Sequence, residues 1–257
     1  MNKIKLSVGH IAISSNKSYP DKPTIVFLHD SLGCIKLWRD FPQKLSEMTG
    51  CNLLVYDRLG YGQSENMQTH KRPINYLELE ADILNELITR LELENVILFG
   101  HSDGGSIALI MASKYPTKIK AIISEAAHIF VDDLTITGIN NAIKAFKTTN
   151  LRERLIKYHG SDKVDDVFKA WTETWTTKEY REWNIEHFLP NIKCPTLVIQ
   201  GEKDEYGTEK QMDGIVGKVS AMTIKLFLED LSHTPHKDNP EQILKHSATF
   251  IKTVLNE

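Results

Sequence analysis

Short apolar runs alternate with amphipathic stretches along this chain, and the alternation predicts its architecture. Six runs have apolar residues on both faces, which is typical of parallel strands buried between two layers of helices. They span residues 24–29, 52–57, 95–100, 120–124, 196–200 and 223–228. Residues 4–13 alternate more loosely and predict an antiparallel edge of the sheet. We therefore expect an α/β fold built on a mostly parallel, doubly wound sheet.

Two further segments show the 3.6-residue period of amphipathic helices. The apolar positions of the first are Leu77, Ala81, Leu84, Ile88 and Leu91, and those of the second are Leu244, Ala248, Ile251 and Leu255. Pro240 precedes the second set, at a position where the first turn of a helix tolerates proline. Both segments are predicted to be helices that cover the sheet.

The alternation stops between residues 128 and 190, where no convincing buried strand occurs. This stretch has only helix-like periodicity, and it is rich in aromatic and charged residues. We expect turns within it at Gly138, at residues 159–162 and at residues 176–178. The chain is thus predicted to have a core of residues 1–127 and 191–257, with residues 128–190 inserted as a helical cap.

Composition narrows the range of functions. Of the 257 residues, 41% are hydrophobic and 25% are charged, which is usual for a globular protein with a sizeable core. The formal charge of −3 provides no basic surface for phosphate backbones, so we expect no nucleic acid as a partner. A small-molecule substrate is the expected partner, and the sequence leaves open a monomer or a homodimer.

Cysteines and apolar runs bear on the cellular compartment. Cys34, Cys51 and Cys194 are odd in number and widely spaced, which predicts neither a disulfide framework nor a C-x-x-C metal site. No apolar run reaches the ~18 residues that a membrane-spanning helix needs. Polar residues also interrupt the amino-terminal segment before the apolar core of a signal peptide forms. We expect a cytoplasmic protein that is not attached to a membrane.

The most informative local pattern is Gly100-His101-Ser102-Asp103-Gly104, a G-x-S-x-G sequence. It stands between a predicted strand and a predicted helix, where a sharp turn places the serine at the end of the sheet. Glycines two residues before and after the serine avoid collisions in such a turn. The pattern therefore predicts that Ser102 is a nucleophile, and the amino terminus of the following helix favours negative charge developing beside it.

A serine hydroxyl is a weak nucleophile, so this interpretation requires a histidine and a carboxylate. Asp204 follows the predicted strand 196–200, and His233 follows the strand 223–228, directly before the last helix. The chain order serine, acid, histidine is the one expected with this kind of turn. The alternatives are Glu125, Glu202 and Glu205 for the acid and His236 for the base.

With these motifs, the chain resembles the α/β-hydrolase superfamily over nearly its whole length. Residues 29–33, His-Asp-Ser-Leu-Gly, are similar to the H-G-x-x-G loop of that family, and residues 56–64 are similar to its D-x-R-G-x-G-x-S segment. The resemblance implies an oxyanion hole formed by the backbone N–H groups of Ser31 and Asp103. Asp30 and Ser232 stand where the family usually has glycine, but neither departure removes a catalytic group.

Four residues are predicted to line a substrate pocket: Trp38, His128, Trp171 and Trp175. The first two follow strand ends, at the edge of an open α/β sheet where ligands bind. The two cap tryptophans share one helical face and either line the pocket or form the core of the cap. The remaining histidines are scattered and predict no metal site, and no cofactor is implied. We interpret Arg152 and Arg154 as part of a solvated helix face.

These residues predict acyl hydrolysis, in which Ser102 attacks a carbonyl, His233 transfers the proton and water releases the acyl group. The expected substrates are small or medium carboxylic esters with a largely apolar acyl part, because the cap is aromatic and lacks an obvious arginine cluster. Two alternatives stay open: carbon–carbon bond cleavage or elimination by the same triad, and a receptor that binds a small molecule without turnover. Thr234 and Pro235 argue modestly against carbon–carbon cleavage, because family members with that activity often have tryptophan after the base.

Overall fold

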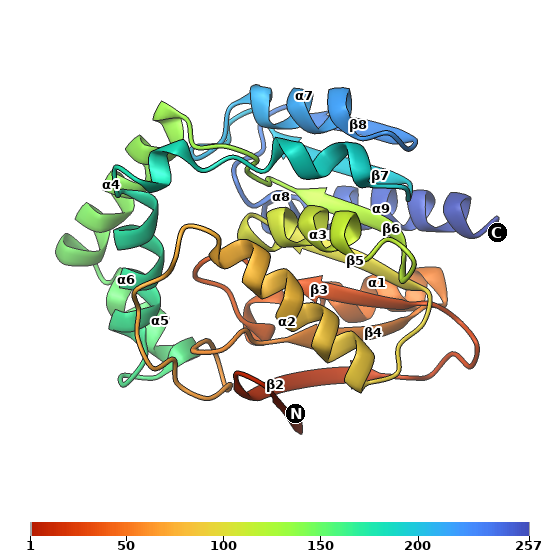
Figure 1. Ribbon diagram of the computed structural model, residues 1–257, viewed down its shortest axis with the longest axis horizontal. Helices are drawn as coiled ribbons and strands as arrows, with labels where there is room; N and C mark the ends of the chain where they lie inside the picture. The colour runs from red at the N-terminus through yellow and green to blue at the C-terminus, as the bar shows by residue number, and fades with distance from the viewer. Residues whose placement is uncertain (1, 257) are drawn as a thin grey trace.

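The computed structural model describes residues 2–256, which form one eight-stranded sheet covered by helices on both faces (Figure 1). The strands are β1 (Asn2–Leu6), β2 (Gly9–Asn16), β3 (Thr24–Leu28), β4 (Asn52–Tyr56), β5 (Val96–His101), β6 (Ile119–Glu125), β7 (Thr196–Gly201) and β8 (Thr223–Leu228). Their order in the sheet is β1-β2-β4-β3-β5-β6-β7-β8. Strands β3 to β8 are parallel, whereas β1 and β2 pair antiparallel at one edge. The predicted mostly parallel sheet is confirmed.

Helices on each face of the sheet enclose a separate apolar core. Helices α2 (Tyr76–Arg90), α3 (Asp103–Lys114) and α7 (Glu209–Lys218) cover one face, and α1 (Phe41–Thr49) and α9 (Pro240–Leu255) cover the other. The short helices η1 (Ile35–Trp38) and α8 (Pro235–Asp238) lie in loops after β3 and β8. Both predicted amphipathic helices occur, as α2 and α9, and Pro240 is the first residue of α9. None of these or the other described helices is both long and apolar enough to cross a membrane.

One edge of the sheet agrees with the sequence-based expectation and the other differs from it. The antiparallel edge expected for residues 4–13 occurs as a hairpin of two strands, β1 and β2, with a turn between Leu6 and Gly9. Strand β8 is not buried on both faces: Ile224 and Phe227 are exposed, and Lys225 pairs with acidic side chains of α7. The physical reason is its position, since β8 is an edge strand that pairs with β7 alone among the described strands. An apolar run does not reveal where a strand lies in the sheet.

The chain between β6 and β7 is helical, as expected. It forms α4 (Asp133–Thr148), α5 (Leu151–His159), α6 (Val164–Trp175), η2 (Tyr180–Glu182) and η3 (Glu186–Asn191). Figure 1 shows α4, α5 and α6 grouped beyond one end of the strands. The turns at residues 159–162 and 176–178 follow α5 and α6, but the expected turn at Gly138 is wrong. Gly138 lies inside α4, where an added Cβ would be only 2.6 Å from the carbonyl oxygen of Glu205, so glycine allows close packing there.

Strand β5 turns into α3 at Ser102 with almost no room for side chains. Ser102 has φ 55° and ψ −119°, a conformation that costs a residue with a side chain about 1–3 kcal/mol. An added Cβ on Gly100 would lie 2.1 Å from the carbonyl oxygen of Gly104, and one on Gly104 would lie 2.1 Å from that of Leu28 in β3. Both positions of the G-x-S-x-G sequence therefore require glycine, because another segment of the main chain passes too close to leave space for a side chain.

We expect Gly104→Ala to lower the free energy of unfolding by at least about 1–3 kcal/mol, because the new methyl group meets a carbonyl of a central strand. Gly217→Ala is the matched control, since Gly217 lies in α7 and an added Cβ there has no neighbour within 4 Å. That variant should be neutral or more stable by up to about 1 kcal/mol, because alanine favours a helix interior. Chemical denaturation measures both, and equal stabilities would contradict the packing argument.

Candidate active site

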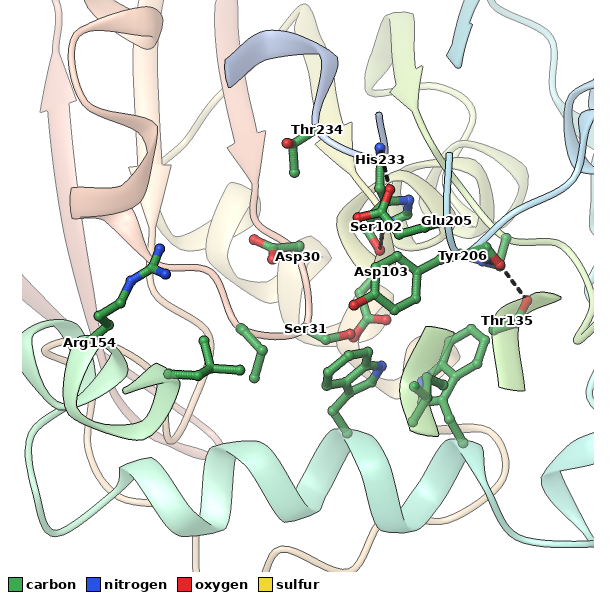
Figure 2. A pocket seen from close by; sticks show the side chains of 16 residues that line it. Asp30, Ser31, Ser102, Asp103, Thr135, Arg154, Glu205, Tyr206, His233 and Thr234 are labelled. Carbon is green, nitrogen blue, oxygen red and sulfur yellow. Dashed lines mark hydrogen bonds between the residues drawn. The ribbon is translucent and has the colours of Figure 1, made fainter. Parts of the chain in front are cut away.

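Ser102, His233 and Asp204 form a hydrogen-bonded row where β5, β8 and β7 end. Nε2 of His233 lies 2.9 Å from Oγ of Ser102 (Figure 2). Nδ1 of the same ring lies 2.8 Å from Oδ1 of Asp204. All three side chains are largely buried. The structure thus brings together residues that are up to 131 positions apart in the sequence. With the proton on Nδ1 facing the carboxylate, Nε2 can accept the proton of the serine hydroxyl.

Asp204 is kept ionised by His233 and by hydrogen-bond donors close to it in the chain. Its Oδ1 accepts hydrogen bonds from the N–H groups of Tyr206 and Gly207, at 2.9 and 3.1 Å, and Nε2 of Gln200 lies 3.3 Å from Oδ2. Burial alone would raise the pKa of the Asp204 carboxyl, but His233 and these donors lower that pKa to about 2. Burial also favours the neutral ring of His233, yet the neighbouring carboxylate raises the pKa of His233 above its ordinary value of 6.5. The row is arranged to hold a proton on the imidazole once the serine releases it.

The raised pKa of His233 predicts the pH dependence of the reaction. Activity needs the neutral imidazole, so kcat/KM should fall as the pH drops through a midpoint above 6.5. Asp204→Asn removes the charge that raises the pKa, so the midpoint should move to lower pH while the plateau falls by about 10³- to 10⁴-fold. The pH profiles of wild type and variant test this. A midpoint that stays in place would show that another acid orients His233.

The two residues implied as oxyanion donors lie beside the serine. Ser31 and Asp103 line the same cavity as Ser102, and Asp103 is the first residue of α3, so its N–H has no acceptor within the helix. Nδ1 of His29 and a guanidinium N–H of Arg58 donate to the carbonyl oxygen of Asp30, at 2.7 and 2.9 Å, and hold the loop in place. Asp30 does not adopt a positive φ, so this loop has no need of the glycine usual in the family.

The side chain of Asp103 forms a buried ion pair beneath the cavity. Its Oδ2 lies 3.2 and 3.3 Å from the two terminal nitrogens of Arg58, and it accepts the hydroxyl of Tyr76 at 3.1 Å. The Tyr76 oxygen in turn accepts the indole N–H of Trp175 in α6 at 2.8 Å. The turn at Ser102 is thereby connected to α6 through a continuous row of hydrogen bonds. Local sequence patterns gave no indication of Tyr76, because its partners are distant in the chain.

A second acid–histidine pair lies behind the first. Oε1 of Glu125 accepts the backbone N–H of His236 at 2.8 Å, and Oε2 lies 2.5 Å from Nδ1 of the same residue. The backbone carbonyl of Glu125 accepts the N–H of Ser102 at 2.9 Å, and the His101 ring lies 2.8 Å from the carbonyl oxygen of His233. These contacts, which we call the buried brace, connect the turn of the nucleophile to the loop of the base.

The contacts of the brace bear on the alternatives for the acid and the base. Glu125 and His236 pair with each other, whereas Asp204 and His233 form the row with Ser102. Donor atoms of His101, Glu125 and His236 lie within 4.8 Å of one another, which is compatible in number with metal ligation. However, zinc ligands lie about 3 Å or more from one another around the ion. Oε2 of Glu125 and Nδ1 of His236 are only 2.5 Å apart, which leaves no space for an ion between them. The group is built as a support.

Glu125→Gln should separate positioning from proton transfer. We expect kcat to fall by up to about a hundredfold with little change in KM, because the base loop loses its anchor and small misplacements are costly. The acid midpoint of the pH profile should stay where it is in wild type, since the Asp204 charge remains. The comparison with Asp204→Asn, made at a temperature where thermal unfolding shows both variants folded, checks this. A midpoint that shifts as in Asp204→Asn would instead make Glu125 the orienting acid.

The row faces a cavity of about 400 Å³. Of the residues predicted to line it, His128, Trp171 and Trp175 do so. The prediction for Trp38 needs correction: its side chain is buried in the core under α1 and packs against His236 at a ring-centroid distance of 4.6 Å. A residue after a strand end can turn into the core as well as toward the ligand. The Cys34 thiol is also buried, which raises its pKa to about 12 and makes it a poor nucleophile.

Sequence reasoning missed much of the cavity wall. The additional lining residues are Asp30, Leu32, Thr135, Ile139, Leu151, Arg154, Glu205, Tyr206 and Thr234. The ring of Tyr206 packs on the imidazole of His233 at a centroid distance of 4.8 Å. Its place two residues after Asp204 is a signal that could have identified it, because the same loop must pass the base. The aliphatic residues gave no comparable signal.

The fold and this site define a class of protein, and comparisons with known proteins agree on it. The family described as alpha/beta hydrolase fold matches residues 23–143. The chain is 28% identical over 232 residues to mouse (Mus musculus) serine hydrolase BPHL, covering 88% of this chain and 78% of the relative. It is 25% identical over 206 residues to putative esterase/lipase 2 of Mycoplasma genitalium, covering 75% of each. The solved structure of a membrane phospholipase A superposes with a TM-score of 0.81 at 19% identity, covering 100% of this chain and 86% of that one.

These similarities agree with the strand order and with the turn at Ser102. The chain has the α/β-hydrolase fold, and its sequence is similar to serine hydrolases over most of its length. Its curated relatives make it a hydrolase of that fold.

Proposed function

We propose that this chain hydrolyses small or medium carboxylic esters through an acyl-enzyme on Ser102. The observation that supports this best is the row from Ser102 to His233 to Asp204, with contacts of 2.9 and 2.8 Å, at the wall of a cavity that is partly apolar. Two indole rings and several aliphatic side chains suit an apolar acyl group. One relative is itself named a putative esterase/lipase, which agrees with this substrate class.

The proposed reaction has two halves, acylation of Ser102 and hydrolysis of the acyl-enzyme, and each group of the site acts in both. His233 takes the proton of the Ser102 hydroxyl while the oxygen attacks the carbonyl carbon, and the N–H groups of Ser31 and Asp103 bind the oxyanion. The imidazolium then gives its proton to the ester oxygen, the C–O bond breaks and the alcohol leaves. Water, deprotonated by His233, attacks the acyl group, and collapse of the second oxyanion releases the acid and restores Ser102. Asp204 stabilises the imidazolium in both halves.

We further propose that residues 128–190 act as a cap that determines specificity. The catalytic side chains come from loops at the ends of the strands, whereas much of the facing wall comes from α4, α5 and α6. The hydrogen bond from Trp175 to Tyr76 ties this segment to the turn at Ser102. A cap of this kind can change its lining without altering the catalytic row.

Ser102 should react with an alkyl fluorophosphonate at a single site, because only a serine beside a base and an oxyanion hole is activated. Wild type should then hydrolyse short p-nitrophenyl esters, and Ser102→Ala should lose this activity. The measurement is kcat/KM together with mass mapping of the adduct. Labelling of another residue would contradict the assignment of the nucleophile.

The same assay separates the alternatives. A dienone acid is the probe for carbon–carbon cleavage, and cleavage of it faster than ester hydrolysis by more than about a hundredfold, ~2.7 kcal/mol in barrier, would overturn the ester proposal. Saturable binding of a small molecule with no turnover of any ester would favour a receptor.

A further inference from the structure

The wall of the cavity contains a cation that has no acidic partner among residues 2–256. Arg154 of α5 lines the cavity, and Figure 2 shows its side chain on the side of the cavity away from Tyr206 and Thr135. The sequence suggested that Arg152 and Arg154 share a solvated face, but the two differ. The guanidinium of Arg152 makes two hydrogen bonds to Asp165, at 2.8 and 2.7 Å, whereas no ion pair joins Arg154 to a described carboxylate.

Helical geometry explains why the two arginines point differently. Residues three positions apart lie on the same face of a helix, and residues two apart do not. Leu151, three positions before Arg154, also lines the cavity, whereas Arg152 does not. Arg154 is thus presented to the cavity next to an aliphatic residue of the same helix. Arg154 is exposed, as expected for a solvated helix face, and it lines the cavity as well.

Three carboxylates also line the cavity, but each already has a partner in the protein. Asp103 accepts hydrogen bonds from Arg58 and Tyr76. Glu205 accepts the backbone N–H of His233 at 3.1 Å, and Asp30 lies 3.9 Å from Nδ1 of His101. Arg154 is the charged group of the lining that is exposed and has no ion pair with a described carboxylate, so its guanidinium is free to bind a ligand.

We propose that Arg154 binds the anionic end of the substrate, so that the preferred ester has an apolar chain ending in a carboxylate. This rests on the ester hydrolysis proposed above and specifies its substrate class. The nucleophile, Leu151 and Arg154 line one cavity, which suits a molecule with a scissile ester, an apolar middle and a distal charge. A guanidinium is suited to this task, because its planar donors match a carboxylate.

Paired substrates with one leaving group test the proposal. Mono-p-nitrophenyl adipate and p-nitrophenyl hexanoate have acyl chains of equal length and differ in the terminal carboxylate. We expect kcat/KM to favour the adipate by about tenfold or more, as a charged hydrogen bond predicts, and added salt to reduce the preference. Mono-p-nitrophenyl glutarate and pimelate, each compared with its uncharged counterpart, show which length reaches Arg154.

Variants on the same helix assign the effect. Arg154→Gln should bring the ratio of the two kcat/KM values close to one, and Arg154→Lys should retain part of it. Arg152→Gln, two residues away and outside the cavity, should leave the ratio as in wild type. An equal ratio in wild type across the chain-length series, or an unchanged preference in Arg154→Gln, would overturn the proposal.

A binding measurement keeps this test separate from the reaction itself. In Ser102→Ala, quenching of tryptophan fluorescence by monomethyl adipate and by methyl hexanoate reports affinity without turnover, because Trp171 and Trp175 line the cavity. The adipate should bind more tightly, and adding Arg154→Gln should remove the difference. If wild type hydrolysed no ester, the proposed function would be wrong while this comparison still decided the role of Arg154. Equal affinities, or tighter binding of the uncharged ester, would reject that role.

Discussion

The backbone of Ser102 is the constraint around which the site is arranged. Its positive φ of 55° is unfavourable for a residue with a Cβ, and such conformations persist only where the surroundings fix them. Here the N–H of Ser102 is bonded to the carbonyl of Glu125, and its own carbonyl accepts the N–H of Ser106 in α3. The contact between Gly104 and Leu28 presses the same turn against β3. A strained turn held from three directions keeps the hydroxyl in one position relative to the base.

Three buried acid–base pairs surround that turn, and each fixes a different segment. Asp204 and His233 belong to the loops after β7 and β8, Glu125 and His236 join the end of β6 to α8, and Asp103 and Arg58 join α3 to the loop after β4. Burying charges is costly, and such pairs add little net stability compared with apolar packing. Their effect here is to fix which loops meet and at what distance. We therefore explain these buried pairs by their effect on the position of the loops more than by a contribution to the stability of the fold.

The sequence predicted those residues of the site whose role is indicated by the residues next to them in the chain. The G-x-S-x-G turn, Asp204 and His233 follow predicted strands, and parallel strands bring their carboxyl ends to one edge. The structure places them together for that reason. Tyr76 and Trp38 could not be assigned, because their environment is set by packing between distant segments. The position of Arg154 at the cavity depends on which face of α5 the residue occupies, and the exposure of β8 depends on the order of the strands in the sheet.

The spread of the catalytic groups along the chain has a consequence for biosynthesis. The proposed nucleophile is residue 102, whereas the proposed acid and base are residues 204 and 233. A ribosome must therefore add 131 residues after Ser102 before the proposed base is made. Because β7 and β8 are added beside β6 at the far side of the sheet, the nascent turn at Ser102 can form while remaining chemically silent. Under the proposed assignment, Ser102 gains its base only when the loop after β8 has been made, so a chain that ends before His233 should be inert.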